Sequence, residues 1–101
     1  MYEDRIRLAT LMDKVMTADR AAALFRDGMT VGMSGFTRAG DAKALPLALV
    51  ERARQAPLHL TLLTGASLGN DSDGLMANAG VVARRMPFQA DAALRLKINT
   101  G

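Results

Sequence analysis

Short apolar runs bounded by turn residues predict three β-strands in this chain. Residues 30–36 (TVGMSGF) form the first run and carry two glycines, residues 58–64 (LHLTLLT) form the second, and residues 81–86 (VVARRM) form the third. The second run alternates at first and then becomes apolar at successive positions, which is typical of a strand covered by helices on both faces. We therefore expect the strands of a buried, parallel sheet.

Apolar residues at helical spacing predict helices between these runs. Thr17 has a side chain suited to cap a helix over residues 17–27, and Pro46 stands near the start of a second helix over residues 46–55. Proline is favoured in the first turn of a helix, because its missing N–H has no partner there in any case. Both segments therefore fit crossover helices between strands.

Three further segments have helical patterns. Residues 5–15 predict a short helical lead-in, residues 75–78 a single helical turn, and residues 91–98 a last helix with Asp91 as its cap. The alternation of helices and strands predicts an α/β fold, with right-handed βαβ units around a parallel sheet. Because three strands leave exposed edges, we expect them to be part of a larger sheet.

The composition allows one small domain and excludes several chemistries. The chain has 101 residues, of which 50% are hydrophobic, so it can bury a single modest core. Cysteine is absent and His59 is the only histidine, which excludes disulfides, thiolate or histidine metal sites and a Ser-His-Asp triad within this chain. We expect no metal site, and we expect His59 to be a packed or edge residue.

Charge and hydropathy argue against nucleic-acid and membrane partners. The net charge of +3 comes from scattered arginines, and the aromatic residues are few (three Phe, one Tyr and no Trp). The apolar runs fall far short of the roughly 20 residues that cross a bilayer. The N-terminus also lacks the continuous apolar segment of a secretory signal. We therefore expect a cytoplasmic protein.

Two glycine-rich loops follow the first two predicted strands, at residues 35–41 (GFTRAGD) and 64–70 (TGASLGN). Ligands of open α/β sheets bind beyond the carboxyl ends of the strands, where such loops converge. Glycines let a ligand approach the backbone, and the hydroxyl groups of Thr37, Thr64 and Ser67 can hydrogen-bond a carbonyl or carboxylate. Turns also need glycine, so the glycines alone leave a purely structural role open.

The glycine spacing does not fit the common nucleotide motifs. Gly32, Gly35 and Gly40 match neither the dinucleotide fingerprint G-x-G-x-x-G nor the P-loop, and Asp41 stands where the P-loop requires lysine. We expect no kinase-like phosphate transfer.

Three motifs in order carry a resemblance to a known family. They are VGMSGFTRAGDAKALPLALVERA (residues 31–53), LTLLTGASLG (residues 60–69) and RMPFQADAALRLKINTG (residues 85–101). They resemble the N-terminal domain of acetyl-CoA hydrolases and succinyl-CoA:acetate CoA-transferases, which are class I CoA-transferases. The resemblance implies a CoA-transferase-like α/β fold of the NagB/RpiA/CoA-transferase type. It identifies residues 1–101 as the N-terminal part of that domain.

The resemblance also implies a reaction. A family glutamate attacks the acyl-CoA thioester and becomes a glutamyl-CoA thioester, which a carboxylate acceptor or water resolves. By motif position the glutamate lies outside this chain, so we expect no catalytic residue within it and no activity from the chain alone. Glu51 is then an exposed surface residue. Coenzyme A is a substrate, no cofactor is bound permanently, and the partners are acyl-CoA, small carboxylates and, we expect, further copies of the protein.

The resemblance assigns substrate-binding positions within the two loops. Gly35, Phe36, Thr37 and Gly40 would line the active-site cleft, and Ser67 would face the acyl or carboxylate group. A role of Ser67 in satisfying the loop backbone is the alternative.

Four other points of the sequence stay open. Ala90 stands where carboxylate-transferring members commonly have threonine, which leaves the acceptor undetermined. We expect Arg84 and Arg85 at the surface, although either could meet a carboxylate or a coenzyme A phosphate. Two other functions also remain: a non-catalytic truncated subunit that binds a partner through its open sheet edge, and an unrelated α/β domain that binds a small ligand such as a sugar phosphate.

Overall fold

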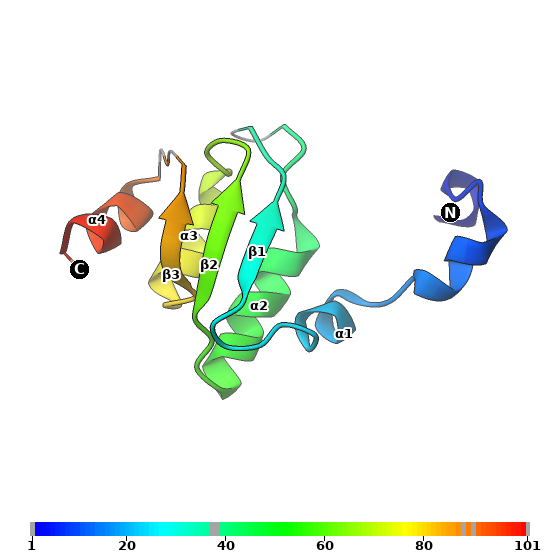
Figure 1. Ribbon diagram of the computed structural model, residues 1–101, viewed down its shortest axis with the longest axis horizontal. Helices are drawn as coiled ribbons and strands as arrows, with labels where there is room; N and C mark the ends of the chain where they lie inside the picture. The colour runs from blue at the N-terminus through cyan, green and yellow to red at the C-terminus, as the bar shows by residue number, and fades with distance from the viewer. Residues whose placement is uncertain (1, 37–38, 88, 90, 101) are drawn as a thin grey trace.

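The computed structural model describes residues 2–36, 39–87, 89 and 91–100. Three strands, β1 (Thr30–Met33), β2 (Leu60–Thr64) and β3 (Val82–Met86), pair in the order β1-β2-β3, and both pairs are parallel (Figure 1). This confirms the predicted α/β fold with a parallel sheet.

The helices lie before, between and after the strands. They are the 3-10 helices η1 (Tyr2–Arg5) and η2 (Ala9–Lys14) and the α-helices α1 (Ala18–Ala22), α2 (Ala44–Gln55), α3 (Asn70–Asn78) and α4 (Ala92–Thr100). Both predicted caps are confirmed. Thr17 Oγ1 accepts a hydrogen bond from the Arg20 N–H at 3.2 Å, and Asp91 Oδ2 accepts one from the Leu94 N–H at 3.0 Å.

Two helical predictions, the helix over residues 17–27 and the lead-in over residues 5–15, are wrong in extent. The α1 helix ends at Ala22, well before residue 27, because the residues after it bond to the entry of β2. The Gly28 N–H donates to the His59 carbonyl at 2.7 Å, and Asp27 Oδ1 accepts from the His59 N–H at 2.7 Å. The lead-in forms two 3-10 helices, and η2 has no buried residue that would stabilise an α-helix by packing.

Two elements near the predicted loops also differ in length. The α3 helix begins at Asn70, ahead of the predicted turn at residues 75–78, because the Ser72 and Asp73 N–H groups both donate to the Gly69 carbonyl at 2.9 Å. Strand β1 ends at Met33, short of the predicted residue 36, because the Gly35 carbonyl accepts from the Ala66 N–H at 3.1 Å, in the loop that follows β2, instead of continuing the sheet.

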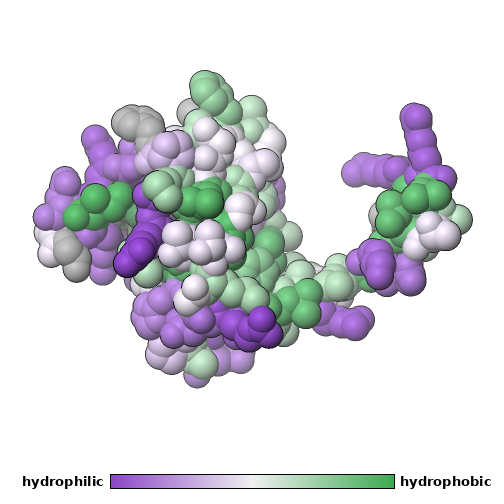
Figure 2. Space-filling view, in the orientation of Figure 1, coloured by the Kyte–Doolittle hydropathy of each residue, from purple (hydrophilic) through white to green (hydrophobic). Residues whose placement is uncertain are grey.

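One face of the sheet is packed and the other is open. Helices α2 and α3 lie behind the sheet in Figure 1, and the core they enclose includes Leu49, Leu60 and Leu62. Side chains on the opposite face remain exposed, with Leu63 at 37% and Met86 at 58%. Figure 2 shows this open face with hydrophobic and hydrophilic surface interspersed.

The prediction of helices on both faces is therefore wrong for the described part of the chain. Right-handed crossovers that step in one direction across a sheet place their helices on the same side. The strand order β1-β2-β3 is such a series of steps, so the packed face receives both crossover helices.

Close packing beside β1 gives a prediction. A Cβ atom built on Gly35 would lie 2.5 Å from Leu68 Cδ2 and 3.1 Å from Asp41 Cβ, whereas one built on Gly32 meets nothing within 4 Å. Gly35→Ala should therefore lower the free energy of unfolding by about 1–3 kcal/mol through overpacking. Gly32→Ala, the matched control, should be neutral or raise it by up to about 1 kcal/mol. Urea denaturation of both variants tests this. Equal changes in the free energy of unfolding would show that residue 35 can accommodate a methyl group without overpacking.

Candidate functional site

The loops that follow β1 and β2 lie side by side at the carboxyl end of the sheet. The β1 loop comprises residues 34–41 and the β2 loop residues 65–69. The Ala66 N–H donates to the Gly35 carbonyl at 3.1 Å, and the Gly69 N–H donates to Asp41 Oδ2 at 3.3 Å. The predicted proximity of the two loops is thus confirmed, and it follows from the parallel pairing of adjacent strands.

The β1 loop folds back on itself. Phe36 and Ala39 exchange two backbone hydrogen bonds at 3.0 and 2.9 Å, and Ser34 Oγ donates to the Gly40 carbonyl at 2.8 Å. Gly40 has φ of 71°, a conformation that favours glycine. The Phe36 side chain is exposed, with 69% of the residue's surface accessible. Gly35 and Gly40 therefore shape a tight turn that presents Phe36 outward.

Two residues singled out in the sequence lie outside the described residues. These are Thr37, one of the expected cleft residues, and Ala90, the expected departure from the family pattern.

Ser67 is buried in the middle of the β2 loop, with only 3% of its surface accessible. Its hydroxyl donates a long hydrogen bond to the Leu68 carbonyl at 3.3 Å. Thr64 Oγ1, the other described hydroxyl of this segment, donates to the Ala66 carbonyl. Both hydroxyls thus lie within the turn between β2 and α3.

Asp41 connects the two loops electrostatically. One of its carboxylate oxygens accepts from the Lys43 ammonium and the other from the Gly69 N–H, while the side chain itself is only 2% accessible. The Lys43 ammonium, followed by the Gly69 N–H, holds the pKa of Asp41 below its ordinary value, against the opposing effect of burial. Asp41 is therefore a charged link across the site.

Asp73 and Arg85 form a second buried link. Both side chains have 0% accessible surface, and the Arg85 guanidinium donates from both Nη atoms to the two carboxylate oxygens of Asp73. Asp73 Oδ2 also accepts from the Leu68 N–H at 3.1 Å, and Arg85 Nη2 donates to the Ala66 carbonyl at 3.4 Å. The pair therefore holds the β2 loop on both sides of Ser67.

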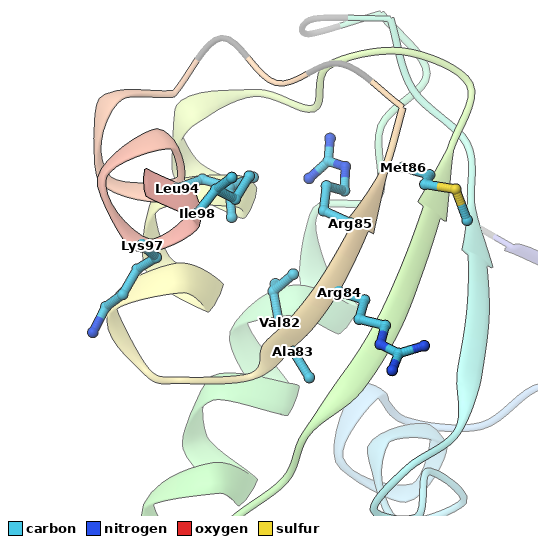
Figure 3. Close-up of a pocket in the computed structure, with 8 residues that line it drawn as sticks. All are labelled: Val82, Ala83, Arg84, Arg85, Met86, Leu94, Lys97 and Ile98. Atoms are coloured by element: carbon cyan, nitrogen blue, oxygen red, sulfur yellow. The ribbon is translucent and has the colours of Figure 1, made fainter. Parts of the chain in front are cut away.

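The expected surface position of Arg85 is wrong. Successive residues of a strand point to opposite faces, so adjacent Arg84 and Arg85 cannot both face solvent when one face is packed. Figure 3 shows the two side chains pointing away from each other, and Arg84 is the exposed one. The partner, Asp73, was missed because a polar residue between a glycine-rich loop and the helical turn predicted at residues 75–78 matches an ordinary exposed position.

A hollow of about 610 Å³ lies between β3 and α4 and is drawn in Figure 3. Its lining includes Arg84, Arg85, Met86, Leu94 and Lys97. It lies along the outer side of β3 rather than between the two loops. We therefore place the candidate site at the loops, where the family motifs meet, and not in this hollow.

Other residues considered from the sequence lie at the surface. Glu51 is exposed and accepts from Arg54 at 3.0 Å, which confirms its predicted surface position. His59 is exposed and contacts the Asp27 carboxylate at 2.9 Å. The His59 backbone N–H, followed by its side chain, lowers the pKa of Asp27. Within the described residues no group of three metal-ligating acidic or histidine side chains occurs, and no helix is long and apolar enough to cross a membrane.

Acid titration tests the electrostatic link at Asp41. A carboxyl whose pKa is lower in the folded state stabilises the fold above its unfolded pKa, about 3.9, and this contribution disappears as the pH falls through the folded value. The free energy of unfolding should therefore fall below about pH 4, and less steeply in Asp41→Asn and in Lys43→Met. Urea denaturation between pH 2 and pH 7 measures it. If the free energy of unfolding of the parent chain and of both variants fell equally with pH, Asp41 would not couple the loops.

Comparison with known proteins shows the family. The model of the acetyl-CoA hydrolase/transferase N-terminal domain matches residues 2–101. The chain is 46% identical over 101 residues to a succinyl-CoA:acetate CoA-transferase of Clostridium kluyveri, covering 98% of this chain and 19% of the relative. It is 42% identical over 91 residues to a propanoyl-CoA:succinate CoA transferase of Escherichia coli, covering 85% of this chain and 18% of the relative.

An acetyl-CoA hydrolase of Kluyveromyces lactis is 34% identical over 105 residues, covering 100% of this chain and 20% of the relative. The chain thus spans about a fifth of the length of these relatives. The chain belongs to the acetyl-CoA hydrolase/transferase family, and its match is to the N-terminal domain of that family.

Proposed function

We propose that this chain acts as the N-terminal part of a longer enzyme that moves coenzyme A between an acyl-CoA and a carboxylate, or hydrolyses the acyl-CoA. The observation that carries the proposal is the meeting of two family motifs at one place. The SGF-containing β1 loop and the TGAS-containing β2 loop are hydrogen-bonded to each other at the carboxyl end of the sheet. The names of the relatives, two transferases and a hydrolase, support the reaction class.

The proposed reaction uses a glutamate outside this chain as the nucleophile. Its carboxylate attacks the thioester carbonyl, the coenzyme A thiolate leaves, and an acyl-glutamyl anhydride forms. The thiolate then attacks the glutamyl carbonyl and releases the free carboxylate, which leaves a glutamyl-CoA thioester. An acceptor carboxylate reverses these steps and takes up coenzyme A, whereas water in its place completes hydrolysis.

The loops of this chain would act on the carboxylate and on the oxyanions of these steps. Backbone N–H groups of glycine-rich loops can stabilise developing negative charge without reorganising, provided that the loops are held in place. Gly35, Phe36, Thr37 and Gly40 would form one wall of the cleft, and Ser67 would hydrogen-bond the acyl or carboxylate group. Coenzyme A is a substrate in this proposal, and no permanently bound cofactor is required.

We infer that the nucleophile lies outside the described residues. Glu51 lies on the exposed side of α2 with Arg54 as its partner, so it cannot serve as the buried carboxylate that this chemistry needs. We therefore propose that the 101-residue chain by itself neither transfers nor hydrolyses acyl-CoA. We also propose a cytoplasmic homo-oligomer as the working form.

The open face of the sheet favours one alternative. Strand β3 pairs with β2 on one side, and the described residues place no strand on its other side. An open edge and an open face suit a truncated subunit that captures a partner without catalysis. Activity in a completed enzyme would exclude this alternative as the main function.

A chimaera tests the proposed function. Residues 1–101 replace the matching fifth of the Clostridium kluyveri relative, and transfer of coenzyme A from succinyl-CoA to acetate is followed. We expect turnover by the chimaera and none by the isolated chain. Ser67→Ala in the chimaera should cost about 1–3 kcal/mol in kcat/KM for the carboxylate, because it leaves a buried polar partner unpaired.

Two results would contradict this account. An inactive but folded chimaera would remove the proposed function, and unchanged kinetics of Ser67→Ala with acetate and succinate would make Ser67 a loop residue only. Glu51→Ala is the control and should leave turnover unchanged. Turnover by the isolated chain that vanishes in Glu51→Ala would place the nucleophile within this chain after all.

A further inference from the structure

The β2 loop is held by charged side chains from three separate elements. Asp41 of the β1 loop accepts from the Gly69 N–H at 3.3 Å, and Asp73 of α3 accepts from the Leu68 N–H at 3.1 Å. Arg85 of β3 donates to the Ala66 carbonyl at 3.4 Å. Ala66 and Leu68 flank Ser67, so the Asp73–Arg85 pair restrains both peptide groups next to that serine.

The Asp73–Arg85 pair is an expensive way to stabilise a fold. Both side chains are fully buried, and burying two charges costs several kcal/mol per ion before their mutual attraction offsets it. Replacing such a pair by apolar residues of similar volume is often neutral or stabilising. Within the described residues, Arg85 Nε has no hydrogen-bond partner, so the guanidinium is not fully satisfied even here. Its Nη groups are directed at Asp73 and at the loop.

The position of the pair in the fold suits it to fix the β2 loop relative to α3 and β3. Asp73 lies in the first turn of α3, immediately after the β2 loop, and Arg85 lies near the carboxyl end of β3, the next strand. The doubly hydrogen-bonded geometry of arginine with carboxylate fixes direction as well as distance. The ion pair therefore anchors the β2 loop to α3 and β3, two rigid elements that are separate from the β1 loop.

We propose that Asp73 and Arg85 are positioning residues for the carboxylate-binding step: their ion pair fixes the backbone on both sides of Ser67 and so holds in place the loop that would bind the substrate carboxylate. This proposal rests on the proposed function. It predicts that the pair matters for handling of the carboxylate more than for binding of coenzyme A, because its contacts are confined to the β2 loop.

The decisive variant is the double substitution Asp73→Leu/Arg85→Met. It removes both charges together, so no charge is left buried alone, yet it also removes the acceptor of the Leu68 N–H and the donor to the Ala66 carbonyl. A purely structural pair would tolerate this change. A positioning pair would not.

The experiment measures kcat and KM for acetate and for succinyl-CoA separately in the chimaera described above, with circular dichroism to establish folding. We expect kcat/KM for acetate to fall at least about tenfold in the double variant while KM for succinyl-CoA changes less than about twofold. Asp73→Asn keeps an oxygen acceptor for the Leu68 N–H and should give a smaller loss. Removal of the exposed pair by Glu51→Gln/Arg54→Gln, the matched control, should change neither parameter.

Each outcome decides between the two proposals. A folded double variant with unchanged acetate kinetics, in a chimaera that is otherwise active, overturns the positioning role and leaves the proposed function standing. A parent chimaera that folds but shows no turnover overturns the proposed function and this proposal with it. If the double variant does not fold, Arg85→Lys and Asp73→Asn carry the same comparison. A folded pair of single variants with unchanged acetate kinetics again overturns the positioning role.

Discussion

A fully buried ion pair, Asp73 with Arg85, connects the helix, the strand and the loop that meet at the candidate site. Neither side chain reaches solvent, so each charge depends on the other and on the loop groups that complete their hydrogen bonds. If the loop moved away, Asp73 would lose its hydrogen bond from the Leu68 N–H and Arg85 would lose the Ala66 carbonyl, which would leave buried polar groups unsatisfied. Together with the carboxylate of Asp41, the pair turns a glycine-rich segment into a fixed one. Fixed donors are what stabilisation of a developing oxyanion requires.

The sheet that carries this site is covered by helices on one face only. Helices cover one face, and the other face presents Leu63, Arg84 and Met86 to solvent. Parallel sheets are usually buried on both faces. In the proposed enzyme, the remaining part of the polypeptide would cover the open face and bring its glutamate to the two loops.

Much of this architecture was predictable from local patterns. The three strands, the caps at Thr17 and Asp91 and the meeting of the two loops follow from apolar runs, cap chemistry and parallel topology. Family membership followed from motifs that sequence alone displays.

What could not be predicted depends on tertiary contacts. The early end of α1 results from hydrogen bonds between residues 27–28 and His59, far along the chain. The burial of Arg85 depends on which face of β3 the helices cover. Its pairing with Asp73 depends on how α3 lies against that strand. The direction of the crossovers determines which face of the sheet the helices cover, and no single segment of the sequence encodes that direction. Buried charge pairs are therefore the part of the site that sequence patterns missed.

The central claim is that buried charges hold the two loops as one rigid unit, and amide hydrogen exchange tests it most directly. The amides to follow are those of Ala66, Leu68 and Gly69, whose acceptors are Gly35, Asp73 and Asp41 respectively, with Thr61 of β2 as the internal reference. The account predicts that all three exchange about as slowly as Thr61, and that Asp73→Asn accelerates Leu68 more than Thr61. Exchange of the three loop amides at the rate of an unstructured segment, while Thr61 stays protected, would contradict it.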